Sequence, residues 1–134
     1  MVNKLNPQLE DLKQFLSKVP DLELAILIGS QATGTAHDQS DWDIAVRWHQ
    51  QAEISIIKLL ARPEVLRHDL AQFLNVSNEQ VDLIDLTNVG LTMRAVVAEE
   101  GLVLKGEDTL AWYHFLQRTW RDLEDFYRNK CYAA

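Results

Sequence analysis

The most constraining feature of this chain is a pair of apolar segments joined by a Gly-Ser turn and a short polar stretch. The first segment, Leu22–Ile28, is largely apolar and predicts a buried strand. Gly29 and Ser30 follow it, then ten residues at 31–40, then a second apolar segment, Asp41–Trp48. An excursion this short joins neighbouring strands, so we expect an antiparallel pair.

The chemistry of this pair lies at its polar ends. Asp41 and Asp43 are two residues apart in a strand, so their side chains point to the same face. Two carboxylates this close repel unless a cation sits between them, and Mg²⁺ is the usual cation for an oxygen-only site. Gly29 lets the backbone approach a phosphate, and Ser30 offers a hydroxyl and an amide at a helix start. The pattern predicts a nucleotide site.

Together these residues resemble the nucleotidyltransferase superfamily with a DNA polymerase β-like palm, whose signature is Gly-Ser, ten residues, then Asp-x-Asp. The short chain looks like the minimal nucleotidyltransferase group, and the resemblance covers roughly residues 20–105. Members of that group often act as antitoxins beside HEPN-domain ribonuclease toxins. Many relatives carry arginines in the loop after Gly-Ser, where this chain has Gln31 and Thr33.

The family pattern requires a third acid, for which Asp82 and Asp85 compete. They are three residues apart on the predicted strand 81–86, so they face opposite sides and only one can join Asp41 and Asp43. The resemblance favours Asp82, which would bind metal or accept a proton from the attacking hydroxyl. The competing interpretation is a solvent-facing acid at a strand edge.

The remaining periodicities predict one α/β (α+β) domain over residues 1–134, with a small mixed sheet of the polymerase β-like type. We expect helices after the second strand to pack on one face of the sheet. Arg62-Pro63 should separate two of them, because the residue before proline avoids the helical region. The expected helices are 6–19, 51–61, 63–74, 89–99 and a C-terminal helix at about 107–129, and a short fourth strand is expected at 102–104.

Charge and composition restrict the partners. The net charge of −7 argues against direct binding of nucleic acid and suits a basic protein partner, although solubility alone also explains it. No segment reaches the ~20 apolar residues that a membrane span needs. A single cysteine, Cys131, rules out an internal disulfide framework and fits a cytoplasmic protein.

Several other residues are candidates for supporting roles. Cations near the triphosphate could come from Arg47, Arg94 and Lys105, and His37 lies in the Gly-Ser excursion. The C-terminal helix carries a stripe that we expect to be core, with Tyr113 and Phe126 beside it as candidates for a protein contact. The stripe consists of Trp112, Leu116, Trp120, Leu123 and Tyr127.

The resemblance implies a specific function. Two Mg²⁺ ions held by Asp41, Asp43 and Asp82, with Gly29 and Ser30 at the phosphates, would transfer AMP from ATP to a hydroxyl. The acceptor would be a tyrosine of a partner HEPN toxin, which the modification would silence within a hetero-oligomer. Two alternatives stay open: a non-catalytic antitoxin that blocks its toxin sterically, and an enzyme that modifies an antibiotic.

Overall fold

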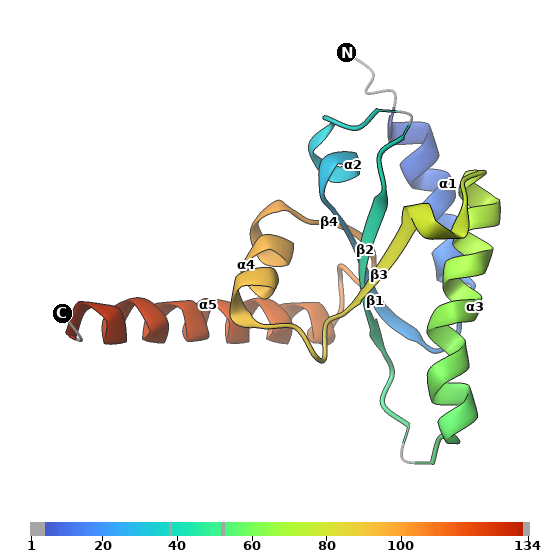
Figure 1. Cartoon of the computed structure of the whole chain (residues 1–134). Coiled ribbons are helices and arrows are strands. Elements are labelled where there is room, and N and C mark those ends of the chain that lie inside the picture. The colour runs from blue at the N-terminus through green and yellow to red at the C-terminus, as the bar shows by residue number, and fades with distance from the viewer. Residues whose placement is uncertain (1–4, 38, 52, 133–134) are drawn as a thin grey trace.

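The fold is built on a mixed four-stranded sheet in the order β3-β2-β1-β4 (Figure 1). The computed structural model describes residues 5–132 except 38 and 52. Strand β1 (Leu22–Ile28) pairs antiparallel with β2 (Trp42–Trp48) and β4 (Leu102–Lys105), and β3 (Val81–Asp85) pairs parallel with β2. The predicted antiparallel pair and the mixed sheet are confirmed.

The helices alternate with the strands along the chain. They are α1 (Leu5–Ser17), the short α2 (Ser30–Thr33), α3 (Ile56–Leu74), α4 (Leu91–Glu100) and α5 (Leu110–Tyr132), with a 3₁₀ turn η1 (Asn78–Gln80) before β3. Among the described residues, no helix combines the length and apolar character that crossing a membrane requires.

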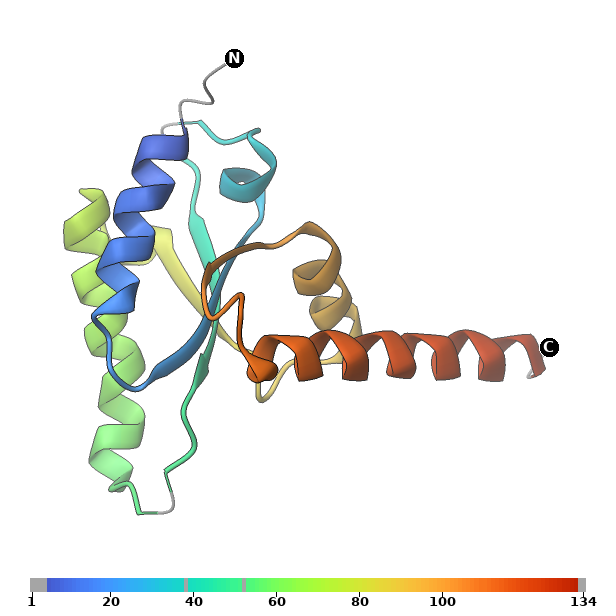
Figure 2. The same ribbon diagram turned by 180° about the vertical axis from the view of Figure 1, so that it is seen from behind.

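Helices cover both faces of the sheet, which corrects the expectation of one covered face. On one face α1 and α3 lie side by side (Figure 2), and they contribute Leu12, Leu16, Leu66 and Leu70 to one core cluster. On the other face α4 and α5 form a second cluster around Val97 and other apolar side chains. Since β1 is buried along most of its length, both faces need cover, and one layer of helices cannot supply it.

The expected break at Arg62-Pro63 is wrong, because α3 runs unbroken through Pro63. Proline inside a helix costs ~3 kcal/mol through its missing N–H and its ring. Leu66 and Leu70 are buried just beyond it, and each such side chain contributes roughly 1.5–3 kcal/mol, which offsets that cost. The helix also starts later than expected: Ser55 caps it by accepting from Lys58 N at 3.2 Å.

Only the first part of α5 packs on the domain, and the rest projects away from it (Figures 1 and 2). Phe115 and Thr119 are buried. Beyond them Trp120 is 44% exposed and Tyr127 is 62% exposed, so the expectation that the whole stripe is core is wrong. The stripe continues along the projecting part of α5, where no other described element covers it.

Candidate active site

The Gly-Ser turn brings the end of β1 against β2. Gly29 has φ 79° and ψ −158°, a conformation that only glycine adopts readily, and α2 begins at the next residue, Ser30. The Gly29 carbonyl accepts from Ala32 N at 3.0 Å and Thr33 N at 3.1 Å, which fixes the turn. A Cβ built on Gly29 would lie 2.7 Å from Asp43 Oδ2. The glycine therefore leaves room for the carboxylate.

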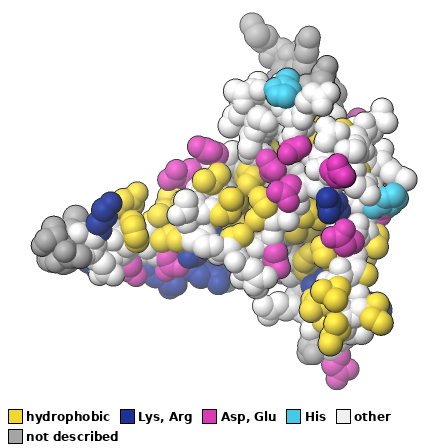
Figure 3. Space-filling view, in the orientation of Figure 1, with side chains coloured by type: hydrophobic (Ala, Val, Ile, Leu, Met, Phe, Trp, Pro, Cys, Tyr) yellow, Lys and Arg dark blue, Asp and Glu magenta, His cyan; other side chains and the backbone are white. Residues whose placement is uncertain are grey.

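Three carboxylates gather at this end of the sheet. Asp43 is paired in register with Ile28 of β1 on one side and with Asp82 of β3 on the other. Asp41 lies one residue before β2, close enough for its charge to act on Asp43. Figure 3 shows acidic side chains clustered over β2 and β3.

The electrostatics of the cluster centre on Asp43. Partial burial raises the pKa of Asp43, and the negative charges of Asp82 and Asp41 raise it further. Asp41 and Asp82 are themselves exposed. An ionised Asp43 is therefore held in an unfavourable field, which a bound cation would relieve.

The donor set suits a hard cation, because carboxylate oxygens are the ligands that Mg²⁺ prefers. Within the described residues, however, no three His, Cys, Asp or Glu side chains are placed so that they could hold a metal ion together. Asp43 is half-buried beside Gly29, whereas Asp41 and Asp82 are exposed. The arrangement fits an open site in which substrate phosphates complete the coordination.

Asp85 has a different role from Asp82. It lies three residues along β3, on the face that α3 covers, together with Val81 and Leu83. Its carboxylate accepts from Thr87 N at 2.9 Å and from Asn88 Nδ2 at 3.0 Å. Asp85 therefore stabilises the turn after β3, on the opposite side of the sheet from Asp43.

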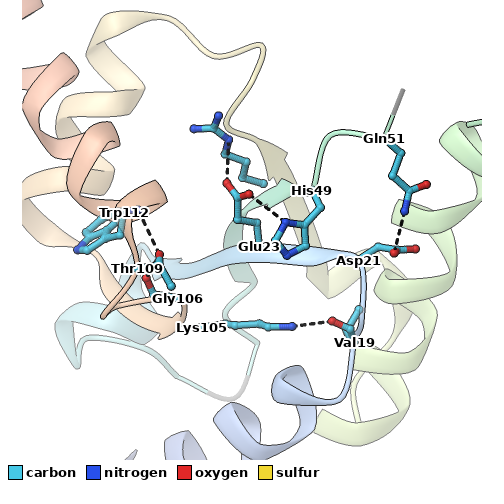
Figure 4. Close-up of polar contacts among 10 residues, drawn as sticks. Val19, Asp21, Glu23, His49, Gln51, Lys105, Gly106, Thr109 and Trp112 are labelled. Atoms are coloured by element: carbon cyan, nitrogen blue, oxygen red, sulfur yellow. Dashed lines mark hydrogen bonds and ion pairs between the residues drawn. The ribbon is translucent and has the colours of Figure 1, made fainter. Parts of the chain in front are cut away.

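The three candidate cations all have partners within the chain. Arg47 Nε lies 3.4 Å from Glu23 Oε1, and Arg94 Nη1 lies 3.0 Å from Asp122 Oδ2. Lys105 donates to the carbonyl of Val19 at 2.6 Å, and burial lowers its pKa (Figure 4). The sequence did not indicate these partners, although Glu23 is the one charge within its strand and sits near Arg47 across the antiparallel pair.

The excursion after Ser30 is held by its own side chains. His37 Nδ1 accepts from Gln39 N at 3.2 Å, and His37 N donates to Ser40 Oγ at 2.8 Å. Gln31, at one of the positions where many relatives carry arginine, is only 7% exposed. Gln31 therefore places an uncharged side chain behind the turn. His37 stabilises the loop through its two hydrogen bonds.

Comparisons with known proteins agree with this geometry. Residues 10–110 match the family described as polymerase beta, nucleotidyltransferase. The protein adenylyltransferase MntA of Aphanizomenon flos-aquae (strain 2012/KM1/D3) is 27% identical over 117 residues, which is 84% of this chain and 78% of that protein.

Two solved structures extend the likeness to nearly the whole chain. A crystal structure of a toxin–antitoxin with AMP-PNP is 27% identical, with a TM-score of 0.66, and the match covers 92% of each chain. A point mutant of the MntA-HpeT toxin–antitoxin is 26% identical, with a TM-score of 0.64, covering 99% of this chain and 95% of that one.

A mixed sheet with a Gly-Ser turn beside strand-borne aspartates defines a nucleotidyltransferase palm. Since the match spans most of its length, this chain belongs to the polymerase beta nucleotidyltransferase family.

Proposed function

We propose that this chain is a Mg²⁺-dependent protein adenylyltransferase that acts as an antitoxin, transferring AMP from ATP to a tyrosine of a partner HEPN toxin. The observation that carries the proposal is the Asp43 carboxylate, seated against Gly29 and in register with Asp82. The relative MntA, named a protein adenylyltransferase, supports the reaction class.

The metal and nucleotide would be held by residues from three elements. Asp41, Asp43 and Asp82 would hold two Mg²⁺ ions, which when bound neutralise phosphate charge and lower the pKa of the acceptor hydroxyl. Gly29 and Ser30 would place the β- and γ-phosphates at the start of α2. The AMP-PNP in the similar toxin–antitoxin structure supports ATP as the substrate.

The reaction is an in-line displacement at the α-phosphorus of ATP. The acceptor oxygen forms the new bond to phosphorus as the bond to pyrophosphate breaks, and the hydroxyl proton goes to the Asp82 carboxylate or to solvent. Asp82 is exposed at the edge of the cluster, where an acceptor on another protein could reach it. Asp43 is half-buried and suited to holding position.

A protein acceptor fits the shape of the chain. Asp41 and Asp82 are exposed, and α5 extends outward with exposed aromatic side chains. The toxin–antitoxin complexes among the similar structures support a toxin as the partner. The net charge of −7 suits a basic partner, since opposite charges accelerate encounter.

The test is mass spectrometry of a HEPN toxin co-expressed with this chain. We expect the toxin to gain one or more AMP groups with the wild-type chain and none with Asp43→Asn. Asp85→Asn is the matched control, because it removes a carboxylate from the same sheet on the other face. A stable complex with unmodified toxin would indicate a steric antitoxin, and modification of an antibiotic alone would indicate a small-molecule enzyme. Either result overturns the proposal.

A further inference from the structure

The start of α3 exposes an apolar surface that the fold does not use. Ile56 is 74% exposed, Ile57 79% and Leu60 67%, and they lie within one and a half turns of each other. Figure 3 shows the resulting hydrophobic patch at the lower end of the molecule. A contiguous patch of exposed apolar side chains is typical of a contact surface, whereas single exposed apolar side chains are common on any protein.

A groove opens beside this patch, between the first turns of α3 and the ends of β2 and β3. Its volume is about 950 Å³, and its lining includes Trp48, Ile54, Leu59, Leu60 and Leu83. Leu59 and Leu60 belong both to the groove and to the exposed surface of α3. The patch and the groove therefore form one continuous surface, which we call the α3 groove.

An unpaired cation lies in the wall of the α3 groove. The Cζ of Arg62 lies over the Trp48 ring, 4.8 Å from its centre, at the distance of a cation–π contact. Its Nε and Nη1 atoms are buried and have no hydrogen-bond partner among the described residues. These two atoms carry three of the five guanidinium donors, and leaving three donors unpaired away from water is costly.

The acidic side chains that line the groove do not satisfy Arg62. Glu64 pairs with Arg67 at 3.6 Å, and Asp85 accepts from the turn after β3. A carboxylate from outside the chain would pair with the guanidinium where Arg62 lines the groove, since Arg and carboxylate groups match in geometry as well as charge. The groove thus combines an apolar lining with one cation, Arg62, that could pair with a carboxylate of a bound segment.

We infer that the α3 groove docks a segment of the partner toxin that presents apolar side chains and one carboxylate. The inference rests on the proposed function for the identity of the partner. A second copy of this chain is a poorer occupant, because two chains of net charge −7 repel. The groove lies on the face covered by α3, away from Asp43, so this contact is separate from the site of AMP transfer.

The experiment measures the affinity of the purified chain for its HEPN toxin, with Leu60→Ser and Arg62→Gln as the variants. Leu60 is 67% exposed, so its substitution should leave the fold intact. Lys13→Gln is the matched control for loss of one positive charge, on the exposed surface of α1. We expect each groove variant to raise Kd by about tenfold or more, a change typical of a central contact residue, and Lys13→Gln to leave Kd unchanged.

The outcomes separate the two proposals. AMP transfer at saturating toxin should match wild type in both groove variants, since neither residue lies near Asp43. If toxin binds the wild type and both groove variants equally, the groove inference fails and the proposed function stands. If Leu60→Ser instead dissolves a dimer of this chain, with toxin affinity unchanged, the occupant is a second copy and the inference is again wrong. If wild type binds no toxin, both proposals fail.

Discussion

Gly29 and Asp43 are so close that a Cβ on the glycine would stand 2.7 Å from the Asp43 Oδ2 atom. The positive φ of Gly29 adds a second constraint, because side chains strain that conformation by ~1–3 kcal/mol. The turn and the carboxylate are therefore coupled: any side chain at 29 must displace the group that we assign to metal binding.

Gly29→Ala should consequently lower both stability and AMP transfer. Gly34→Ala is the matched control: Gly34 has a similar φ of +81°, but nothing lies within 4 Å of its Cβ position. We expect both variants to melt at a lower temperature and only Gly29→Ala to lose transfer beyond about tenfold. Equal transfer by the two variants would show that the Gly29–Asp43 contact does not matter to the reaction.

Asp41→Asn and Asp43→Asn should each abolish transfer while leaving the fold intact. Asn keeps the shape of the side chain but is a poor ligand for Mg²⁺. Loss of one ligand should cost several kcal/mol of transition-state stabilisation, on the order of a thousandfold in rate. The measurement is transfer of labelled AMP with Mg²⁺ and with chelator. Full activity in either variant, or activity that ignores chelator, would exclude the metal role.

The raised pKa of Asp43 predicts how Asp43→Asn changes stability with pH. The native state binds the Asp43 proton more tightly than the unfolded state, whose pKa is near the ordinary value of 3.8. Wild type therefore loses stability as pH rises from about 3.8 through the native pKa, and the loss is complete above the native pKa. Asn carries no charge and escapes the loss.

Thermal melts from about pH 4 to pH 8 test this prediction. Asp43→Asn should melt above wild type at neutral pH, and the difference should shrink toward the acidic end. Added Mg²⁺ should raise the melting temperature of wild type and reduce the gap. If Asp43→Asn melts below wild type at neutral pH, the Asp43 carboxylate stabilises the fold. That result would contradict the unfavourable effect of burial and of the Asp82 and Asp41 charges on ionised Asp43.

Substitution of Asp82 and substitution of Asp85 should affect different properties, AMP transfer in one case and stability in the other, since the two residues face opposite sides of β3. We expect Asp82→Asn to slow transfer strongly with little change in melting temperature. Asp85→Asn should act on stability, because its carboxylate accepts from Thr87 N and Asn88 Nδ2 in the turn after the strand. Turnover and melting of both variants decide the matter. If Asp85→Asn stops turnover without altering the melt, the two roles are reversed.

Strand periodicity explains why the cluster could be anticipated from the sequence. Residues two apart on a strand share a face, so the common face of Asp41 and Asp43 followed once their strand was recognised. The parallel register of Asp43 with Asp82 was not predictable, because it depends on how β3 returns to the sheet after α3. The resemblance to known nucleotidyltransferases, and not the spacing alone, favoured Asp82.

The errors arose where tertiary contacts override local preference. Pro63 breaks an isolated helix, but buried leucines beyond it hold α3 together. The partners of Arg47, Arg94 and Lys105 come from other elements of the fold, so sequence spacing could not reveal them. The aromatic stripe of α5 has the period of a packed helix, and the sequence alone does not tell whether the packing partner belongs to the same chain.

A seven-residue repeat on α5, which shares Trp120 and Tyr127 with that stripe, supports the last prediction, which concerns the surface that meets the partner. Tyr113, Trp120 and Tyr127 are spaced by seven residues and are 56%, 44% and 62% exposed. Leu116 and Leu123 lie between them and are half-buried. A seven-residue repeat of large side chains on one helix face is typical of packing against another helix. We therefore predict that the projecting part of α5 packs against a helix of the toxin.

Tyr113→Ala and Trp120→Ala should each weaken toxin binding by ~1–2 kcal/mol if they lie in the centre of that contact. Phe126 is 52% exposed but lies outside this seven-residue repeat, so Phe126→Ala should weaken binding less. Association should also be faster at low salt, because the chain carries a charge of −7 and would attract a basic partner. Salt screens this attraction, and at 0.1 M the screening length is only ~10 Å. Binding of the three variants across a salt series measures both effects. Unchanged affinity in Tyr113→Ala and Trp120→Ala would remove α5 from the interface, while association indifferent to salt would show that charge does not steer the encounter.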